Sequence, residues 1–80
     1  MSRKTTVKPD RKLDCTGLFC PEPVYRTRVE IDKLEKGQVL EVIADDPAAE
    51  EDIKSLAKRI NVQVLQVKKE GSSVNILIRK

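Results

Sequence analysis

The spacing of apolar and polar positions changes along the chain. In two stretches the apolar residues recur at the period of a helix, which predicts two helices. Between residues 21 and 36 the apolar side chains recur at the period of an amphipathic helix. Gly37 follows as a residue suited to the left-handed cap that commonly ends a helix. The face of this helix that we expect to meet the core carries Val24, Thr27, Arg28, Ile31 and Leu34.

A second helix is predicted to begin at Asp46-Pro47. Asp46 offers a carboxylate at the N-cap position, and Pro47 suits the first helical position, where an amide hydrogen has no partner. Asn61 is expected to take the left-handed conformation at the end of this helix. The apolar stripe recurs at i, i+3, i+4 and i+7, at Ile53, Leu56, Ala57 and Ile60.

Two segments in the first half of the chain are predicted to be strands. Residues 11–14 form a short strand with Leu13 as its apolar anchor, and residues 38–44 form an interior strand because most positions are apolar. In the second strand we expect Leu40, Val42 and Ala44 to face the helices, and Val39, Glu41 and Ile43 to lie half exposed on the opposite face.

Two further strands are predicted near the C-terminus as a hairpin. The β-branched residues Val62, Val64 and Val67 indicate a third strand, although the alternation breaks at Leu65 and leaves its register open. A turn at Gly71-Ser72-Ser73 joins it to a fourth strand. The inward positions of that strand are Val74, Ile76 and Ile78.

The resulting order, β-α-β-α-β-β, predicts an α/β (α+β) two-layer sandwich. Right-handed crossovers would place both helices on one face of a four-stranded mixed sheet and leave the other face open. At 80 residues the chain has room for one domain, which we assign to residues 11–80. Its core must be aliphatic, because the chain has one Phe, one Tyr and no Trp.

Residues 1–10 are polar and are expected to form a flexible basic tail. The net charge is +3 and the pI is about 9.0. We expect nucleic-acid contact to be at most indirect or weak, since the chain lacks the interleaved aromatic residues that stack on bases. The excess positive charge is concentrated at Arg3, Lys4, Lys8, Arg11 and Lys12.

Cysteine usage and the absence of long apolar runs limit the class of protein. No apolar run approaches the roughly 18 residues of a membrane span, and the N-terminus lacks the apolar stretch of a signal peptide. We therefore expect a cytoplasmic protein without a membrane partner, whose two cysteines stay reduced. With no histidine, the chain has no Cys-His pair. Its two cysteines cannot supply the four Cys or His ligands of a tetrahedral zinc site, which only a dimer could complete, so no metal is expected.

The candidate chemical group is the thiol of Cys20, in the sequence Cys20-Pro21-Glu22-Pro23. Pro21 and Pro23 fit the first turn of the predicted helix, so Cys20 is expected at its N-terminus. There the helix dipole favours the thiolate and lowers the pKa of the thiol, while the charge of Glu22 opposes this effect. The alternative is an inert, buried cysteine beside a proline-capped helix.

The segment Leu13-Asp14-Cys15-Thr16-Gly17-Leu18-Phe19-Cys20-Pro21-Glu22-Pro23-Val24 resembles the signature L-D-x-x-G-L-x-C-P-x-P of the small TusA/SirA-like sulfur-carrier family. A second, supporting match is Ile43-Ala44-Asp45-Asp46-Pro47-Ala48. The resemblance extends over about residues 12–80 and implies the same two-layer architecture.

The resemblance implies that Cys20 carries sulfane sulfur as a persulfide. The sulfur would come from a cysteine desulfurase or similar donor and pass to a downstream acceptor protein, in tRNA thiolation or related sulfur metabolism. Thiolate attack on sulfur needs no metal or organic cofactor. The protein would act as a sulfurtransferase-type carrier rather than as a free-standing enzyme.

The resemblance also implies roles for four other residues. Arg28 and Asp46 match positions that contact partners, although helix capping is the main role we expect for Asp46. The positive charge of Arg28 would either attract an acidic partner or stabilise the anionic sulfur of Cys20. Asp14 and Gly17 are expected to shape the loop before the helix rather than to take part in the chemistry.

Two residues depart from the family pattern. Phe19 stands where many members have arginine, which leaves the choice of partner open. Cys15 precedes Cys20 by five residues. It is either a resolving thiol that discharges the persulfide or a small apolar residue at the strand end, and we favour the second interpretation.

Two other classes of function stay open. A thiol-disulfide redox protein would use Cys15 and Cys20 as its pair, but their spacing is not C-x-x-C. A nucleic-acid-binding regulatory module would use the basic tail and the open face of the sheet.

Overall fold

The described residues, 8–18 and 22–80 of the computed structural model, form six elements in the predicted order. No helix in this part of the chain has the length and apolar character needed to cross a membrane. The elements are β1 (Arg11–Cys15), α1 (Glu22–Lys33), β2 (Val39–Ala44), α2 (Ala49–Arg59), β3 (Gln63–Glu70) and β4 (Ser73–Arg79).

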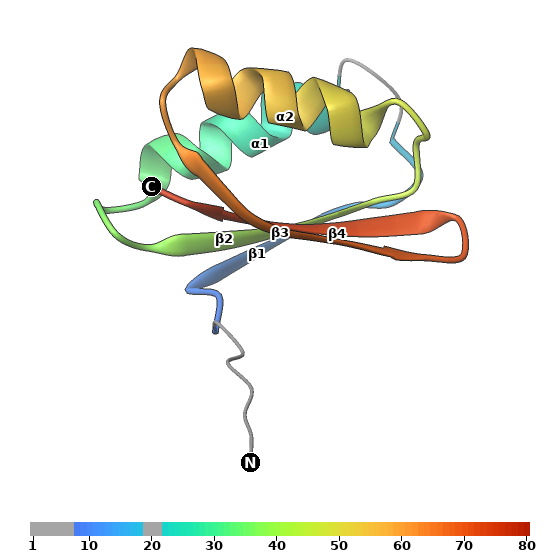
Figure 1. Ribbon diagram of the computed structural model, residues 1–80, viewed down its shortest axis with the longest axis horizontal. Helices are drawn as coiled ribbons and strands as arrows, with labels where there is room; N and C mark the ends of the chain where they lie inside the picture. Colours follow the sequence, from blue (N-terminus) through green and yellow to red (C-terminus); the bar gives the residue numbers. More distant parts are fainter. Residues whose placement is uncertain (1–7, 19–21) are drawn as a thin grey trace.

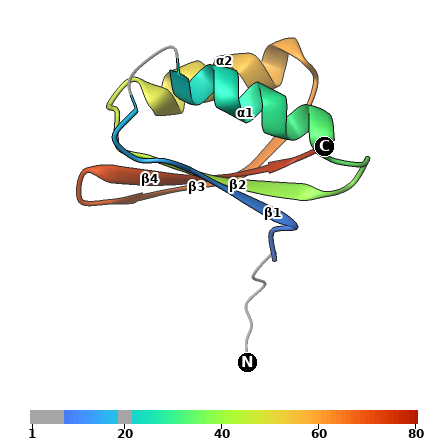
Figure 2. The same ribbon diagram turned by 180° about the vertical axis from the view of Figure 1, so that it is seen from behind.

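The four strands form one mixed sheet in the order β1-β2-β4-β3. β1 runs parallel to β2, whereas β4 is antiparallel to both β2 and β3. Both helices cover the same face of the sheet (Figures 1 and 2), which confirms the predicted two-layer sandwich.

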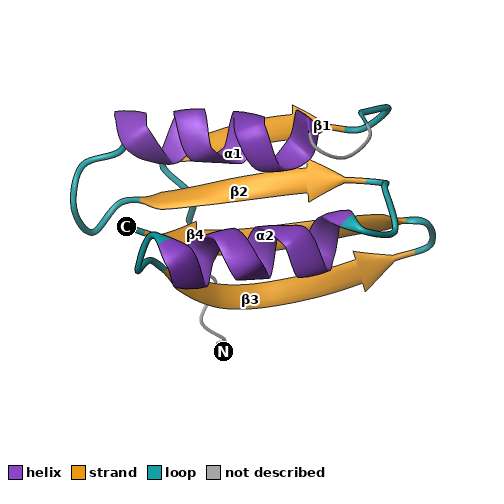
Figure 3. Cartoon of the chain, turned by 90° about the horizontal axis from the view of Figure 1, so that it is seen from above, coloured by secondary structure: helices purple, strands orange, loops and turns teal. Residues whose placement is uncertain are grey.

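The strand directions bring three connections to one end of the sheet. Because β1 and β2 are parallel, the loops that follow Cys15 and Ala44 leave from the same end. Ala44 pairs with Val74 near the start of β4, so the β3–β4 turn also lies there (Figure 3). Both helices begin at this end.

The predicted inner face of β2 is confirmed, since Leu40, Val42 and Ala44 are fully buried. On the other face Glu41 and Ile43 are partly exposed, as expected, but the prediction for Val39 was wrong because only 5% of it is exposed. Two hydrogen bonds tie Asp10 to Val39: the Asp10 amide donates to the Val39 carbonyl (2.8 Å), and the Val39 amide donates to Asp10 Oδ2 (2.8 Å). The chain entering β1 therefore lies against Val39.

The face that α1 buries agrees with the predicted one except at Arg28: Thr27, Ile31 and Leu34 are buried, and Val24 packs against the core. The helix ends at Lys33 rather than near residue 36, and Arg28 is exposed. Pro23, Thr27 and Ile31 are the residues that it buries. Positions four apart lie on one side of a helix, whereas the residue after Thr27 is turned away by about 100°.

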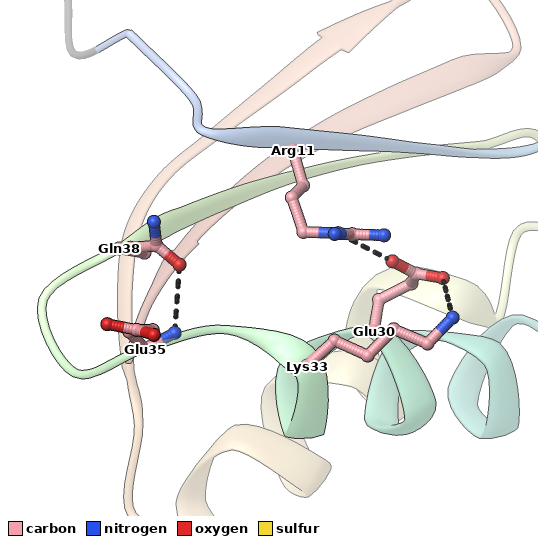
Figure 4. Close-up of polar contacts among 5 residues, drawn as sticks. All are labelled: Arg11, Glu30, Lys33, Glu35 and Gln38. Carbon is pink, nitrogen blue, oxygen red and sulfur yellow. Dashed lines mark hydrogen bonds and ion pairs between the residues drawn. The ribbon is translucent and has the colours of Figure 1, made fainter.

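Polar contacts hold both ends of the segment after α1. Lys80 Nζ donates to the Leu34 carbonyl (2.9 Å), and the Glu35 amide donates to Gln38 Oε1 (2.8 Å; Figure 4). Gly37 has φ = +92°, so the left-handed conformation expected there is confirmed, although it belongs to this turn and not to the position directly after the helix. The turn ends the helix early.

Along its outer side α1 is tied to β1. Arg11 Nε donates to Glu30 Oε1 (2.9 Å), and Lys33 Nζ lies 3.4 Å from Glu30 Oε2 (Figure 4). Burial opposes ionisation of Glu30, but these two cations outweigh it and lower its pKa.

The second helix begins later than predicted. Its N-cap residue is Ala48, with no side-chain capping bond, so the N-cap assignment of Asp46 and the first-turn assignment of Pro47 were wrong. Asp46 instead caps the preceding turn: its Oδ1 accepts from the Ala48 amide (3.0 Å) and its carbonyl accepts from the Ala49 amide (2.9 Å).

The rest of the α2 prediction holds in most respects. Ile53, Leu56 and Ala57 are buried, whereas Ile60 is the partly buried C-cap residue. Asn61 has φ = 61°, which confirms its left-handed conformation.

The C-terminal hairpin contains the irregularity that the broken alternation indicated. The pairing of β3 with β4 shifts between Val64 and Gln66, so Leu65 is the bulged residue. Ser73, predicted in the turn, belongs to β4 and pairs with Glu70.

Candidate functional site

The candidate site is the loop that joins β1 to α1. The structure describes its beginning, residues 16–18, and its end at Glu22. Phe19, Cys20 and Pro21 lie outside the described residues, so the roles predicted for them rest on the sequence.

Asp14 shapes the start of this loop. Its Oδ1 accepts two hydrogen bonds from Thr16, one from the hydroxyl (2.6 Å) and one from the backbone amide (2.9 Å). These bonds, the hydroxyl bond first, lower the pKa of Asp14. The Leu18 amide then donates to the Cys15 carbonyl (3.1 Å), which closes a tight turn.

Gly17 links this loop to the one that follows β2. Its φ is +82°, a conformation that L side chains rarely adopt, so glycine is needed here although the space around it is open. Its amide donates to Asp45 Oδ1 at 3.0 Å. From the sequence, Asp45 is noted only as part of the second family match, and its contact with Gly17 is not predicted. The sequence signal for Asp45 is its position directly after β2. Parallel pairing of β1 with β2 brings the loop that follows each strand to the same end of the sheet.

The first turn of α1 holds the remaining motif residues. Pro23 is buried, which anchors the helix start in the core. Glu22 is exposed in the first turn, and its Oε1 lies 3.3 Å from Arg26 Nε. This ion pair partly offsets the charge that Glu22 brings to the positive end of the helix.

Cys15 lies in the core with none of its surface exposed. Burial raises the pKa of its thiol and outweighs the opposing effect of Arg26, while Asp14 raises it further. At neutral pH the side chain is therefore a protonated thiol that packs as a small apolar group. This environment fits the apolar interpretation of Cys15 and disfavours thiolate chemistry at this position.

The two candidate partner contacts lie at different places on the surface. Arg28 is exposed in the middle of α1 and forms no ion pair with the residues that the structure describes. Asp46 is partly exposed at the start of the turn before α2, at the same end of the sheet as Gly17.

Open clefts lie beside these elements in the described part of the chain. One, of ≈ 310 Å³, lies between the loop after β2 and the β3–β4 turn, where Glu50 pairs with Lys69 (3.1 Å) and Lys54 (2.8 Å). Another, of ≈ 330 Å³, lies between β1 and α1 beside Tyr25, which is 66% exposed. Within residues 8–18 and 22–80 no group of three or more His, Cys, Asp or Glu side chains is placed to hold a metal ion.

These features define a class: small two-layer α/β sandwiches with a cysteine-proline motif in the loop between the first strand and the first helix. The family described as “Sulfurtransferase TusA” matches residues 11–80. The chain therefore belongs to the TusA family.

Curated relatives agree with this assignment. A “Putative sulfur carrier protein” of Archaeoglobus fulgidus is 44% identical over 59 residues, which cover 74% of this chain and 77% of the relative. The “Sulfur carrier protein TusA” of Allochromatium vinosum is 38% identical over 71 residues, covering 89% of this chain and 93% of the relative.

A third relative is much longer than this chain. The “Putative sulfur carrier protein” of Aquifex aeolicus is 47% identical over 74 residues, but these are 92% of this chain and only 38% of the relative.

A solved structure supports the fold independently. The crystal structure of a SirA-like protein from Desulfitobacterium hafniense has a TM-score of 0.77, at 24% sequence identity, and the match covers 86% of this chain and 95% of the other. At that identity the likeness shows the shared architecture.

Proposed function

We propose that this protein is a sulfur carrier that holds sulfane sulfur as a persulfide on Cys20. The observation that carries the proposal is the match of residues 11–80 to the TusA family, together with the place of Cys20 in the sequence, two positions before the start of α1. α1 begins at Glu22, so Cys20 stands in the sequence where the unpaired amides of a helix N-terminus begin. Such a position favours the thiolate.

The proposed chemistry consists of two thiol exchanges. The thiolate of Cys20 attacks the outer sulfur of a persulfide on the donor, so a new S–S bond forms on Cys20 as the donor's S–S bond breaks and its thiolate leaves. A thiolate of the acceptor then attacks the outer sulfur on Cys20 and releases the Cys20 thiolate. One persulfide is consumed and one is formed at each step, so neither step needs an oxidant or a reductant.

The environment of Cys15 favours this proposal over a thiol-disulfide redox function. A redox pair needs two thiols that can meet and ionise, but Cys15 is fully buried and its pKa is raised. Cys20 would therefore act alone, with Cys15 as a packing residue.

We extend the proposal to partners by chemistry. A cysteine desulfurase or similar donor supplies the sulfur, and a second thiol protein receives it for tRNA thiolation or related sulfur metabolism. Arg28, which is exposed, and Asp46, which is partly exposed, are proposed as contacts for these proteins, and Phe19 as a residue that influences which partner binds. Nucleic-acid contact would be weak, and the protein would work in the reducing cytoplasm.

The decisive test is to incubate the protein with a cysteine desulfurase and cysteine and to weigh the product. We expect a gain of about one sulfur atom that reducing agent removes. The gain should persist in Cys15→Ala and be absent in Cys20→Ala. A gain that survives in Cys20→Ala, or a wild-type protein that gains no mass, would refute the proposal.

A further inference from the structure

The loop that leads to Cys20 is attached to the rest of the fold through a carboxylate. Within the loop, the hydrogen bonds of Thr16 and of the Leu18 amide are local: Thr16 is held by Asp14, and the Leu18 amide is held by the Cys15 carbonyl. The Gly17 amide, in contrast, donates to Asp45 Oδ1 (3.0 Å), which is 28 positions away in the sequence. This bond joins the loop after β1 to the loop after β2.

Asp45 lies between two well-anchored segments of the chain. It follows β2, which is paired on one side with β1 and on the other with β4. The next residue, Asp46, caps the turn into α2 through its side chain and its carbonyl. The backbone of Asp45 is thus held on both sides, whereas β1 is an edge strand.

We propose that Asp45 is a positioning residue for sulfur transfer, which holds the loop before Cys20 through the Gly17 amide. The inference rests on the proposed role of Cys20. Gly17 has φ = +82°, so the chain continues from this amide in a direction that a residue in an ordinary conformation would not give it. The bond to Asp45 holds the peptide at this point of the chain, and Leu18 packs against the core just beyond it. The described part of the loop is therefore held in place as far as Leu18.

A purely electrostatic role for Asp45 makes the opposite prediction. A carboxylate near a thiol raises the pKa of the thiol, so removing its charge would increase the thiolate fraction and the reactivity. Removing a positioning contact would decrease productive transfer. The two roles therefore predict opposite changes in the reactivity of Cys20 when Asp45 is removed.

Three variants test the proposal: Asp45→Ala removes the acceptor, Asp45→Asn keeps an acceptor oxygen without the charge, and Glu35→Gln removes an exposed carboxylate at the other end of the sheet. Amide exchange of Gly17, followed by NMR, reports the bond directly. We expect Gly17 to exchange about three- to tenfold faster in Asp45→Ala, as loss of one hydrogen bond predicts, and to stay near the wild-type rate in the other two variants.

The second measurement is the chemistry of Cys20. We expect Asp45→Ala to slow persulfide loading from a desulfurase by about three- to tenfold, and Asp45→Asn to restore it. The rate of alkylation of Cys20 by iodoacetamide, measured against pH, should show no fall in the apparent thiol pKa in Asp45→Ala. Faster alkylation with a lowered pKa in both Asp45 variants would overturn the proposal in favour of an electrostatic role.

The proposal and the function beneath it fail in different ways. If the desulfurase does not load the wild-type protein, the sulfur-carrier function fails, while Gly17 exchange and the alkylation profile still decide whether Asp45 positions the loop. If wild type, Asp45→Ala and Asp45→Asn load at equal rates, the sulfur-carrier function stands and the role of Asp45 is refuted.

Discussion

The buried hydroxyl of Thr27 leads to the most specific prediction about stability. Thr27 lies in the middle of α1 with none of its surface exposed, and its Oγ1 has no hydrogen-bond partner in the described structure. A buried hydroxyl without a partner costs roughly 1–3 kcal/mol, because it has lost its bonds to water. Thr27→Val replaces the hydroxyl with a methyl group of similar size and removes this cost.

We expect Thr27→Val to increase the free energy of unfolding by about 1–2 kcal/mol. The lower part of the range allows for strain from the slightly larger methyl group, and the helix propensities of Thr and Val are nearly equal. For a domain of this size, 1 kcal/mol corresponds to a rise of roughly 4–8 °C in Tm.

Urea denaturation measures the effect through the transition midpoint, and an unchanged slope shows that the unfolded state is the same. Thr27→Ser is the matched control: it keeps the hydroxyl but loses the buried methyl group, so it should be destabilised by roughly 1 kcal/mol. A Thr27→Val protein that is less stable than wild type would mean that the hydroxyl has a partner, and the reasoning would be wrong.

Three further predictions concern other contacts. Lys80→Met should cost about 0.5–1.5 kcal/mol of stability, because it removes the donor to the Leu34 carbonyl. Hydrogen bonds to two lysines lower the pKa of Glu50 from its ordinary value. The stability that these contacts provide is complete above the unfolded-state pKa and is lost as pH falls through the folded-state pKa; in Glu50→Gln this acid-dependent loss of stability should shrink. Cys15→Ala should leave the lifetime of the persulfide on Cys20 unchanged, because a buried thiol of raised pKa is a poor nucleophile, while stability falls by roughly 1 kcal/mol.

Each of these predictions has its own control. Lys36→Met removes an exposed lysine near the same turn and should be neutral in the denaturation assay. Glu51→Gln should reduce the acid-dependent loss of stability less than Glu50→Gln does, because no ion pair of Glu51 is found among the described residues. Mass spectrometry over time follows the persulfide, and a longer lifetime in Cys15→Ala would reinstate Cys15 as a resolving thiol.

Local sequence determined much of this protein. The element order, the apolar stripe of α2 and the left-handed turn at Asn61 follow from short-range preferences, and the structure reproduces them. The break in alternation at Leu65 likewise indicated the bulge, because side chains on a strand must alternate between faces. The sequence motif also singled out Cys20 as the candidate thiol before any fold was known.

Tertiary contacts decided the rest. The Val39 amide is hydrogen-bonded to Asp10, 29 positions away, and the hydrogen bond between Gly17 and Asp45 joins positions 28 apart. Arg28 lies outside because packing selected the row of Pro23 and Thr27 as the inner face of α1. The apolar period of a helix specifies an amphipathic face only to within about one residue, and hydrogen bonds between distant loops leave no periodic signal. Only when parallel pairing brought the ends of two strands together did the loop before Cys20 acquire its attachment to the rest of the fold.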